Sequence, residues 1–216
     1  MQAKTNRQSE QLPLSCLILC GGKSVRMGRT KAFLPYAGTT MIEHLLQTAR
    51  ATFDEVLLIA NEPAMYADLG VDVIKDILPH RGPLGGILSG LLVAANNHCF
   101  VLPCDTPLVD SALLRAMSRR CYQSDVYVLA HKTGIEPLIG VYSKSCIKPL
   151  EEALFAGDPV LHDFVSGLNA ELFDYDTNLG HRKLNGLPAY FSVDTPQEYC
   201  LAVSGPTQDT RLSVKV

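Results

Sequence analysis

Short apolar runs alternate with longer amphipathic stretches along most of the chain, and this alternation restricts the possible folds most strongly. Five runs of four or five residues are typical of buried strands. They lie at 16–20, 56–60, 71–74, 99–102 and 126–130. Amphipathic stretches at 40–51, 84–95 and 111–120 predict helices between them. Strand followed by helix, repeated, predicts βαβ units and a mostly parallel sheet covered on both faces.

Two further apolar runs, at 136–142 and 189–193, predict strands that complete a mixed sheet. The fold class is therefore α/β, a Rossmann-like three-layer α/β/α arrangement with a mostly parallel central sheet. A chain of 216 residues with 47% hydrophobic residues can bury one full core, and no linker divides it. We expect a single domain over 13–204, a flexible N-terminal tail at 1–12 and a C-terminal tail at 205–216.

The charge and cysteine content exclude several classes of partner. The net charge of -3 gives no broad basic surface for a nucleic acid or an anionic membrane. No run approaches the roughly 20 apolar residues that a membrane span needs. The seven cysteines lack the spacing of a zinc site, and we interpret them as small buried hydrophobic residues in the reducing cytoplasm. Phosphate binding, if present, must be local.

Ligands of such sheets lie beyond the carboxyl ends of the strands, so the residues after the first strand are informative. Gly21, Gly22 and Gly28 allow the backbone to approach an anion, with consecutive amide groups forming a nest for phosphate oxygens. Four cations accompany these glycines, namely Lys23, Arg26, Arg29 and Lys31. The segment fits neither the Walker pattern nor Gly-x-Gly-x-x-Gly. Taken alone it fits a triphosphate or a solvated surface turn equally well.

Two aspartates follow apolar runs in the same way. Asp105 lies after 99–102 between Pro103 and Pro107, and Asp194 follows 189–193 directly before a helix signal. A carboxylate at the tip of a buried strand needs a compensating cation, and Mg²⁺ accepts one or two carboxylates together with phosphate oxygens. The alternative is structural. Asp105 can cap a turn or the following helix, and Asp194 or Thr195 can form a helix cap.

A loop and four later blocks, in order along the chain, give a resemblance to a known family. The loop from Leu19 to Lys31, followed by Phe33-Leu-Pro and Gly38, resembles the signature of the nucleotidyltransferases that act on the molybdenum cofactor. Later blocks match that family in the same order over roughly residues 15–203. They are 82–90, 103–107, 136–142 and 193–198. The two glycines of the loop and Pro-Cys-Asp-Thr-Pro are more similar to the guanylyltransferase branch than to the cytidylyltransferase branch.

The resemblance implies a sheet of the nucleotide-diphospho-sugar transferase type and a Mg²⁺-dependent transfer of GMP from GTP to the phosphate of molybdenum-molybdopterin. It implies GTP and molybdenum-molybdopterin as substrates, and molybdoenzyme chaperones or other proteins of molybdenum cofactor biosynthesis as candidate partners. The catalytic residues implied are Arg26, Lys31 and Asp105, and the metal ligands are Asp105 and Asp194. The nucleotide-binding residues implied are Leu19, Cys20, Gly21, Gly22, Lys31, Asn61, Asp76, Gly82, Gly85 and Asp105.

Departures from the family pattern leave alternatives open. Ser192 and Asp194 stand where guanylyltransferases often carry asparagines. A cytidylyltransferase, or a nucleotidyltransferase that acts on another phosphorylated acceptor, therefore remains an alternative function. A nucleotide-binding relative without catalytic activity is a second alternative. No general base is needed for a phosphate nucleophile that is already ionised, so His80 is interpreted as structural or solvated. The polar residues 180–182 could touch an anionic acceptor or form a solvated turn.

Overall fold

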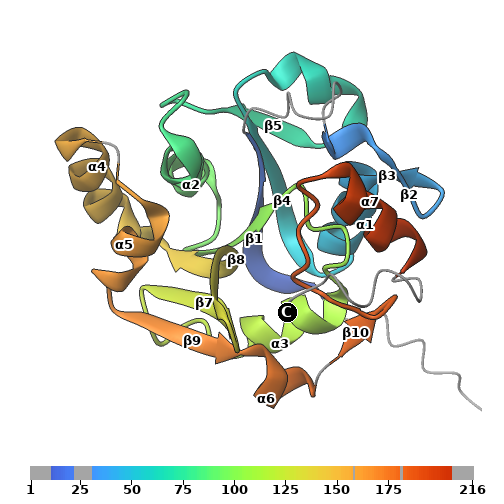
Figure 1. The fold of residues 1–216 in the computed structure, drawn as a ribbon. Coiled ribbons are helices and arrows are strands. Elements are labelled where there is room, and N and C mark those ends of the chain that lie inside the picture. The colour runs from blue at the N-terminus through green and yellow to red at the C-terminus, as the bar shows by residue number, and fades with distance from the viewer. Residues whose placement is uncertain (1–10, 22–30, 158, 181, 206–216) are drawn as a thin grey trace, which may run out of the picture.

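A seven-stranded sheet forms the centre of the computed structural model, which describes residues 11–21, 31–157, 159–180 and 182–205 (Figure 1). Its strands lie in the order β5 (Asp72–Lys75), β4 (Phe53–Ala60), β1 (Leu12–Cys20), β6 (His98–Pro103), β8 (Gly134–Ser143), β7 (Val126–His131) and β9 (Ala170–Asp174). The other neighbouring strands pair in parallel, whereas β8 is antiparallel to both β6 and β7. The mostly parallel mixed sheet predicted from the sequence is confirmed.

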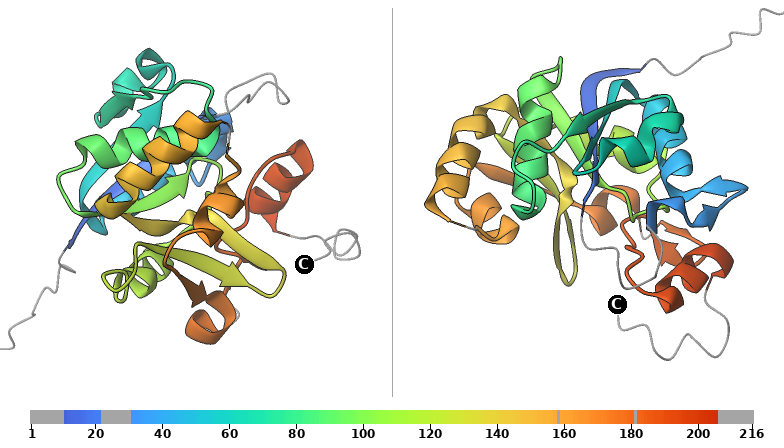
Figure 2. Two further views of the ribbon diagram at one scale, coloured as in Figure 1. Left: turned by 90° about the vertical axis from the view of Figure 1, so that its left-hand side faces the viewer. Right: turned by 90° about the horizontal axis from the view of Figure 1, so that it is seen from above.

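Helices cover both faces of this sheet. The buried side chains of α1 (Met41–Arg50) and α3 (Ser111–Ser118) pack on one face. Those of α2 (Gly82–Val93), α4 (Ile147–Ala156) and α5 (Leu161–Ser166) pack on the other. Figure 2 shows the sheet between these two sets of helices. The result is the expected three-layer α/β/α arrangement.

Helix α2 lies unusually close to the central strand β1, because glycines occupy its contact face. A Cβ atom added to Gly90 would lie 2.5 Å from Leu17 Cδ1, and one added to Gly86 would lie 3.4 Å from Leu19 Cδ2. A Cβ at Gly90 would displace the buried Leu17 of β1, whereas one at Gly86 would make ordinary contact with Leu19. The close approach places the first turn of α2 beside the carboxyl ends of β1 and β4.

Capping residues fix the starts of three helices. Thr40 and Glu43 form the capping box expected at α1, and Thr195 and Glu198 form another at α7 (Pro196–Ser204). The side chain of Asp110 accepts a hydrogen bond from the Leu113 N–H at 2.9 Å and begins α3. The observed α1 and α3 agree with the predicted stretches, and α2 begins two residues earlier than 84–95.

The central sheet differs from the sequence prediction at two segments. Residues 189–193 form no strand, and instead run as turn and extended chain in which the Val193 N–H donates to the Asp105 carbonyl at 2.9 Å. Their backbone is therefore satisfied by a loop rather than by a strand partner. Strand β9 was missed because its run Ala-Glu-Leu-Phe-Asp buries fully only Phe173. It pairs in parallel with β7 at the sheet edge.

Short elements complete the fold. They are η2 (Lys31–Phe33), β2 (Pro35–Tyr36), β3 (Thr39–Thr40), η3 (Pro63–Leu69), η4 (Lys144–Cys146), α6 (Tyr175–Leu179), β10 (Lys183–Leu184) and β11 (Leu187–Pro188). Within the described ranges, no helix combines the length and the apolar character needed to cross a bilayer. Most of the two predicted tails, at 1–10 and 206–216, lies outside the described residues.

Candidate active site

The ends of β1 and β6 bring together the two segments on which the predicted phosphate site depends. Leu19 of β1 is in register with Pro103 of β6, and the Cys104 N–H donates to the Leu19 carbonyl at 3.2 Å. Gly21, which starts the glycine-rich loop, therefore follows one strand end while Asp105 follows its neighbour. The topological expectation that these segments share one edge of the sheet is confirmed.

Part of the predicted loop lies outside the residues that the structure describes. Gly22 and Arg26, together with Lys23 and Arg29, lie outside the described residues, which resume at Lys31. Gly21 is exposed, and a Cβ added to it would meet no described atom within 4 Å. The described part of the site therefore consists of the strand ends that flank this loop and of Lys31.

Lys31 bridges two aspartates from distant parts of the chain. Its Nζ lies 2.6 Å from Asp194 Oδ1 and 3.8 Å from Asp105 Oδ2. Lys31 begins η2, Asp105 follows β6, and Asp194 precedes the N-cap of α7. The Ser192 hydroxyl donates to Asp194 Oδ2 at 3.3 Å. The structure thus brings together Lys31 and both aspartates that the sequence singled out.

Two carboxylates share one ammonium group at this position, and their burial differs. The Lys31 and Asp105 side chains are 14% and 25% exposed, against 59% for Asp194. Burial raises the pKa of the Asp105 carboxyl group, the charge of Lys31 lowers it, and the charge of Asp194 raises it again. A hydrogen bond from Ser192 opposes the increase in this pKa. Asp105 is therefore a carboxylate that further positive charge would stabilise.

The donor set fits a hydrated divalent cation that also binds phosphate. Mg²⁺ binds to one or two carboxylates plus substrate phosphates and water, and Asp105 and Asp194 supply two carboxylates on either side of Lys31. The described residues contain no group of three or more metal-binding side chains. An ion held here would depend on oxygen atoms of a ligand for the rest of its coordination.

The Asp105 and Asp194 alternatives can be compared with the observed caps. Asp105 does not cap α3, because Asp110 does so. The turn after β6 is instead closed by the Thr106 hydroxyl, which donates to the Pro103 carbonyl at 3.0 Å. At α7 the N-cap is Thr195, while the Asp194 side chain faces Lys31. The helix-cap interpretation thus holds for Thr195, and both aspartate side chains are directed to the ammonium group.

Asn61 and Asp76 follow β4 and β5 at the same edge. Asn61 Oδ1 is buried, and no hydrogen-bond donor reaches it from the residues that the structure describes. Asp76 is buried, and its Oδ1 accepts hydrogen bonds from the Leu78 N–H at 3.0 Å and the Ser89 hydroxyl at 2.9 Å. Asp76 therefore has a structural role in addition to any ligand contact, whereas a buried acceptor such as Asn61 Oδ1 fits a ligand donor.

Ser89 is a residue that sequence reasoning missed. It lies in the apolar helix α2, and its buried hydroxyl links this helix to Asp76. The available signal was a single hydroxyl residue on the buried face of 84–95. The nearby glycines serve this packing as well. Gly82 has a φ of 65°, and a Cβ on Gly85 would lie 2.9 Å from the Leu78 carbonyl oxygen.

The cysteine interpretation is largely confirmed. All seven cysteines are unpaired, and Cys16, Cys20, Cys99, Cys121 and Cys146 are buried. The pKa of the Cys20 thiol is raised, first by a hydrogen bond with Cys104 and then by burial. Cys104 is half-buried and Cys200 is exposed. Both effects favour the neutral thiol of Cys20 over the thiolate.

The ends of β7 and β8 carry an aromatic cluster that sequence reasoning did not identify. The His131 ring stacks on Tyr190 with a centroid distance of 4.5 Å, and Nε2 of His131 lies 3.1 Å from Glu136 Oε1.

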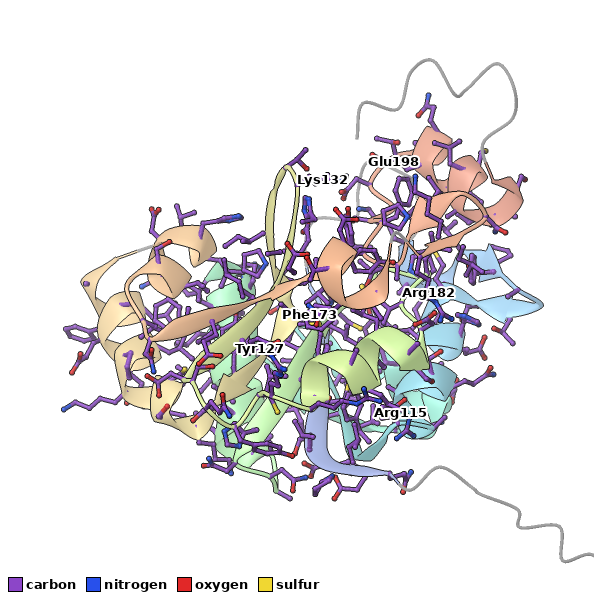
Figure 3. The ribbon with its side chains drawn as sticks, turned by 90° about the horizontal axis from the view of Figure 1, so that it is seen from below. Arg115, Tyr127, Lys132, Phe173, Arg182 and Glu198 are labelled. Atoms are coloured by element: carbon purple, nitrogen blue, oxygen red, sulfur yellow. The ribbon has the colours of Figure 1, made fainter. Side chains whose placement is uncertain are left out.

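Two charged residues lie nearby in the chain. Figure 3 shows Lys132 at the tip of the β7–β8 hairpin. Of the polar residues 180–182, Arg182 forms an ion pair with Asp110 at 2.8 Å, and His181 lies outside the described residues.

Comparison with known proteins agrees with this architecture. The model of the MobA-like NTP transferase domain matches residues 16–171. A probable molybdenum cofactor guanylyltransferase of Carboxydothermus hydrogenoformans is 36% identical over 189 residues, which cover 86% of this chain and 93% of the relative.

Solved structures show the same fold at lower identity. The molybdopterin-guanine dinucleotide biosynthesis protein A of Archaeoglobus fulgidus superposes with a TM-score of 0.74 at 21% identity, covering 88% of this chain and 96% of the other. A Mycobacterium tuberculosis protein solved in complex with manganese gives a TM-score of 0.61 at 19% identity, covering 90% and 100%. On the family match and the 36% identical relative, the chain belongs to the MobA-like NTP transferase family.

Proposed function

We propose that the chain is a molybdenum cofactor guanylyltransferase, which transfers GMP from GTP to the terminal phosphate of molybdenum-molybdopterin and releases pyrophosphate. The observation that carries the proposal is the convergence of Lys31, Asp105 and Asp194 beside the end of β1. Membership of the MobA-like NTP transferase family and the 36% identical relative named as a guanylyltransferase support the choice of GTP and acceptor.

The phosphate end of the site would be held by cations and amides. Asp105 and Asp194 would hold Mg²⁺, which supplies positive charge to the triphosphate and the leaving pyrophosphate. The metal choice is supported by the two-carboxylate donor set and by the manganese complex of the fold neighbour. Lys31 and Arg26 would bind the β- and γ-phosphates, and the backbone from Leu19 to Gly22 would bind phosphate oxygens through its amides.

The guanosine end would lie over β4, β5 and the start of α2. Guanine presents N–H donors, and Asn61 Oδ1 is a buried acceptor without a described donor. Asp76 would accept from a base or ribose donor while Ser89 holds its carboxylate. The turn from Gly82 to Gly85 would approach the base closely.

Catalysis of this reaction depends mainly on the positioning of the two substrates and on electrostatic stabilisation of the charge that develops. An oxygen of the acceptor phosphate attacks the α-phosphorus, the bond from the α-phosphorus to the β-phosphate oxygen breaks, and pyrophosphate leaves with that electron pair. Because the attacking phosphate is already ionised, the site needs no general base. Lys31, and a metal ion held by Asp105, would neutralise the negative charge that accumulates on the leaving group.

The proposal includes one domain over 13–204 and a cytoplasmic location, which seven unpaired cysteines favour. It also includes delivery of the acceptor by molybdoenzyme chaperones or other proteins of molybdenum cofactor biosynthesis. Co-purification with such proteins from the native cell measures this last point.

A pyrophosphate-release assay tests the activity, with Mg²⁺, molybdenum-molybdopterin and GTP, CTP or ATP in parallel. We expect turnover with GTP and its loss in Asp105→Asn. The control Asp72→Asn, at the first residue of β5, should keep wild-type turnover. Preference for CTP would identify a cytidylyltransferase. Binding of GTP without pyrophosphate release would identify a non-catalytic relative, and near-normal turnover of Asp105→Asn would exclude the metal role of this carboxylate.

A further inference from the structure

Lys31 occupies the position between the two carboxylates that would hold the metal ion. Its Nζ is at hydrogen-bond distance, 2.6 Å, from Asp194 Oδ1 and at 3.8 Å from Asp105 Oδ2. The Lys31 side chain is only 14% exposed, whereas the Asp194 side chain is 59% exposed. A lysine whose sole task was to bind a triphosphate in solvent would not need this pair of partners.

The ammonium group and a divalent ion compete for the same oxygen. An ion bound at about 2.1 Å to Asp194 Oδ1 would lie less than about 5 Å from Nζ in its observed position. Like charges at that separation repel strongly in a partly buried site. Metal binding at both aspartates therefore favours a Lys31 conformation in which Nζ has left Asp194.

The phosphates of a nucleotide offer the displaced ammonium group another partner. Lys31 directly follows the glycine-rich loop and carries a flexible four-carbon stem, so Nζ can reorient without movement of η2. A triphosphate adds several negative charges near this loop. It would compensate Lys31 for the loss of Asp194 and at the same time supply the remaining oxygen ligands of the ion.

We propose that Lys31 is an exchangeable counter-ion, which neutralises Asp105 and Asp194 until nucleotide phosphates draw it away and the metal ion takes its position. This inference rests on the proposed function, because it assumes a triphosphate next to a metal held by these aspartates. Its consequence is coupling. Nucleotide raises the affinity for the metal, and the metal raises the affinity for nucleotide by the same factor.

Mn²⁺ binding to the full-length chain, measured by the electron paramagnetic resonance signal of free Mn²⁺, tests the exchange without any turnover. In the absence of nucleotide, Lys31→Met should bind Mn²⁺ about tenfold more tightly than wild type, within the usual range of coupling between sites. Lys31→Arg keeps the positive charge and should stay near wild type. Lys148→Met removes an exposed lysine of α4 and controls for the change in net charge.

The second measurement adds a non-hydrolysable GTP analogue with a methylene bridge between the α- and β-phosphates. Wild type should gain about tenfold or more in Mn²⁺ affinity, whereas Lys31→Met should gain clearly less. Circular dichroism verifies that the variants are folded, and Lys31→Gln replaces Lys31→Met if the latter unfolds.

The outcomes separate the exchange from the proposed function. If Lys31→Met binds Mn²⁺ no more tightly than wild type, while Asp105→Asn abolishes Mn²⁺ binding in the presence of the analogue, the exchange is wrong and the metal site stands. If Asp105→Asn leaves Mn²⁺ binding unchanged with the analogue, the metal site itself is wrong and the exchange is excluded with it.

Discussion

Removing the Ser89 hydroxyl tests whether the buried link between α2 and Asp76 stabilises the molecule. Ser89 Oγ lies 2.9 Å from Asp76 Oδ1 and 2.8 Å from the Gly85 carbonyl oxygen, two acceptors that share its single hydroxyl proton. It accepts from the Ile77 N–H at 3.0 Å, and the residue is 1% exposed. Ser89→Ala leaves this N–H without its acceptor. It also removes one donor from the carboxylate of Asp76, so that Oδ1 keeps only the hydrogen bond from the Leu78 N–H.

The magnitude follows from the charge of the acceptor. A hydrogen bond to a charged group contributes about 1.5–3 kcal/mol. Alanine regains about 0.5 kcal/mol through its better helix propensity. We therefore expect Ser89→Ala to lower the free energy of unfolding by about 1–2.5 kcal/mol. For a domain of this size the melting temperature should fall by about 2–4 °C for each kcal/mol.

Urea unfolding followed by far-ultraviolet circular dichroism measures this loss by linear extrapolation. Ser118→Ala is the matched control, because Ser118 is also buried in a helix but its hydroxyl donates only to the Leu114 carbonyl of the same helix, at 2.8 Å. The control should change the free energy of unfolding by less than about 0.5 kcal/mol. A loss in Ser89→Ala no larger than in Ser118→Ala would refute the link to Asp76.

Three further outcomes are expected. The pKa of Glu43 is lowered by hydrogen bonds within the α1 cap. Its contribution to stability is therefore present above the pKa of the unfolded state and is lost as pH falls through the pKa of the folded state. Glu43→Gln should flatten this pH dependence of the free energy of unfolding, measured by urea titrations. Gly140→Ala should cost about 1–3 kcal/mol by thermal melting, because the added Cβ would lie 2.9 Å from a carbonyl oxygen of β7, whereas Gly167→Ala meets only ordinary contacts. Arg182→Gln should change the unfolding free energy by less than about 1 kcal/mol, because its ion pair with Asp110 is half exposed.

The parts of the fold that the sequence predicted are those with a strong local pattern. The runs at 16–20, 56–60 and 99–102 are apolar throughout because parallel strands between two helical layers are buried on both faces. Their carboxyl ends must then share one edge, so the convergence of Gly21 and Asp105 followed from topology alone. No contact had to be known in advance.

The contacts of Lys31 could not be predicted in the same way. Lys31 and Asp194 are 163 residues apart, and no periodicity relates them. The loop and the acidic turn were each recognisable, but the ion pair depends on how 189–194 crosses the sheet edge. The apolar run at 189–193 predicted a strand from its composition. Ala189 and Val193 are indeed buried, but they are buried in a loop that tertiary contacts hold in place.

The register of β8 explains why that crossing occurs beside Asp105. Strand β8 pairs with β6 only as far as Val101 and Gly140, and a bulge between Glu136 and Gly140 then directs it along β7 alone. The Tyr142 hydroxyl, which donates to the Pro137 carbonyl at 2.6 Å, supports this bulge from the buried side. The end of β6 therefore has no pairing with β8, and the Val193 N–H donates to the Asp105 carbonyl just beyond it. The irregularity of one antiparallel strand thus admits the segment that carries Asp194 to Lys31.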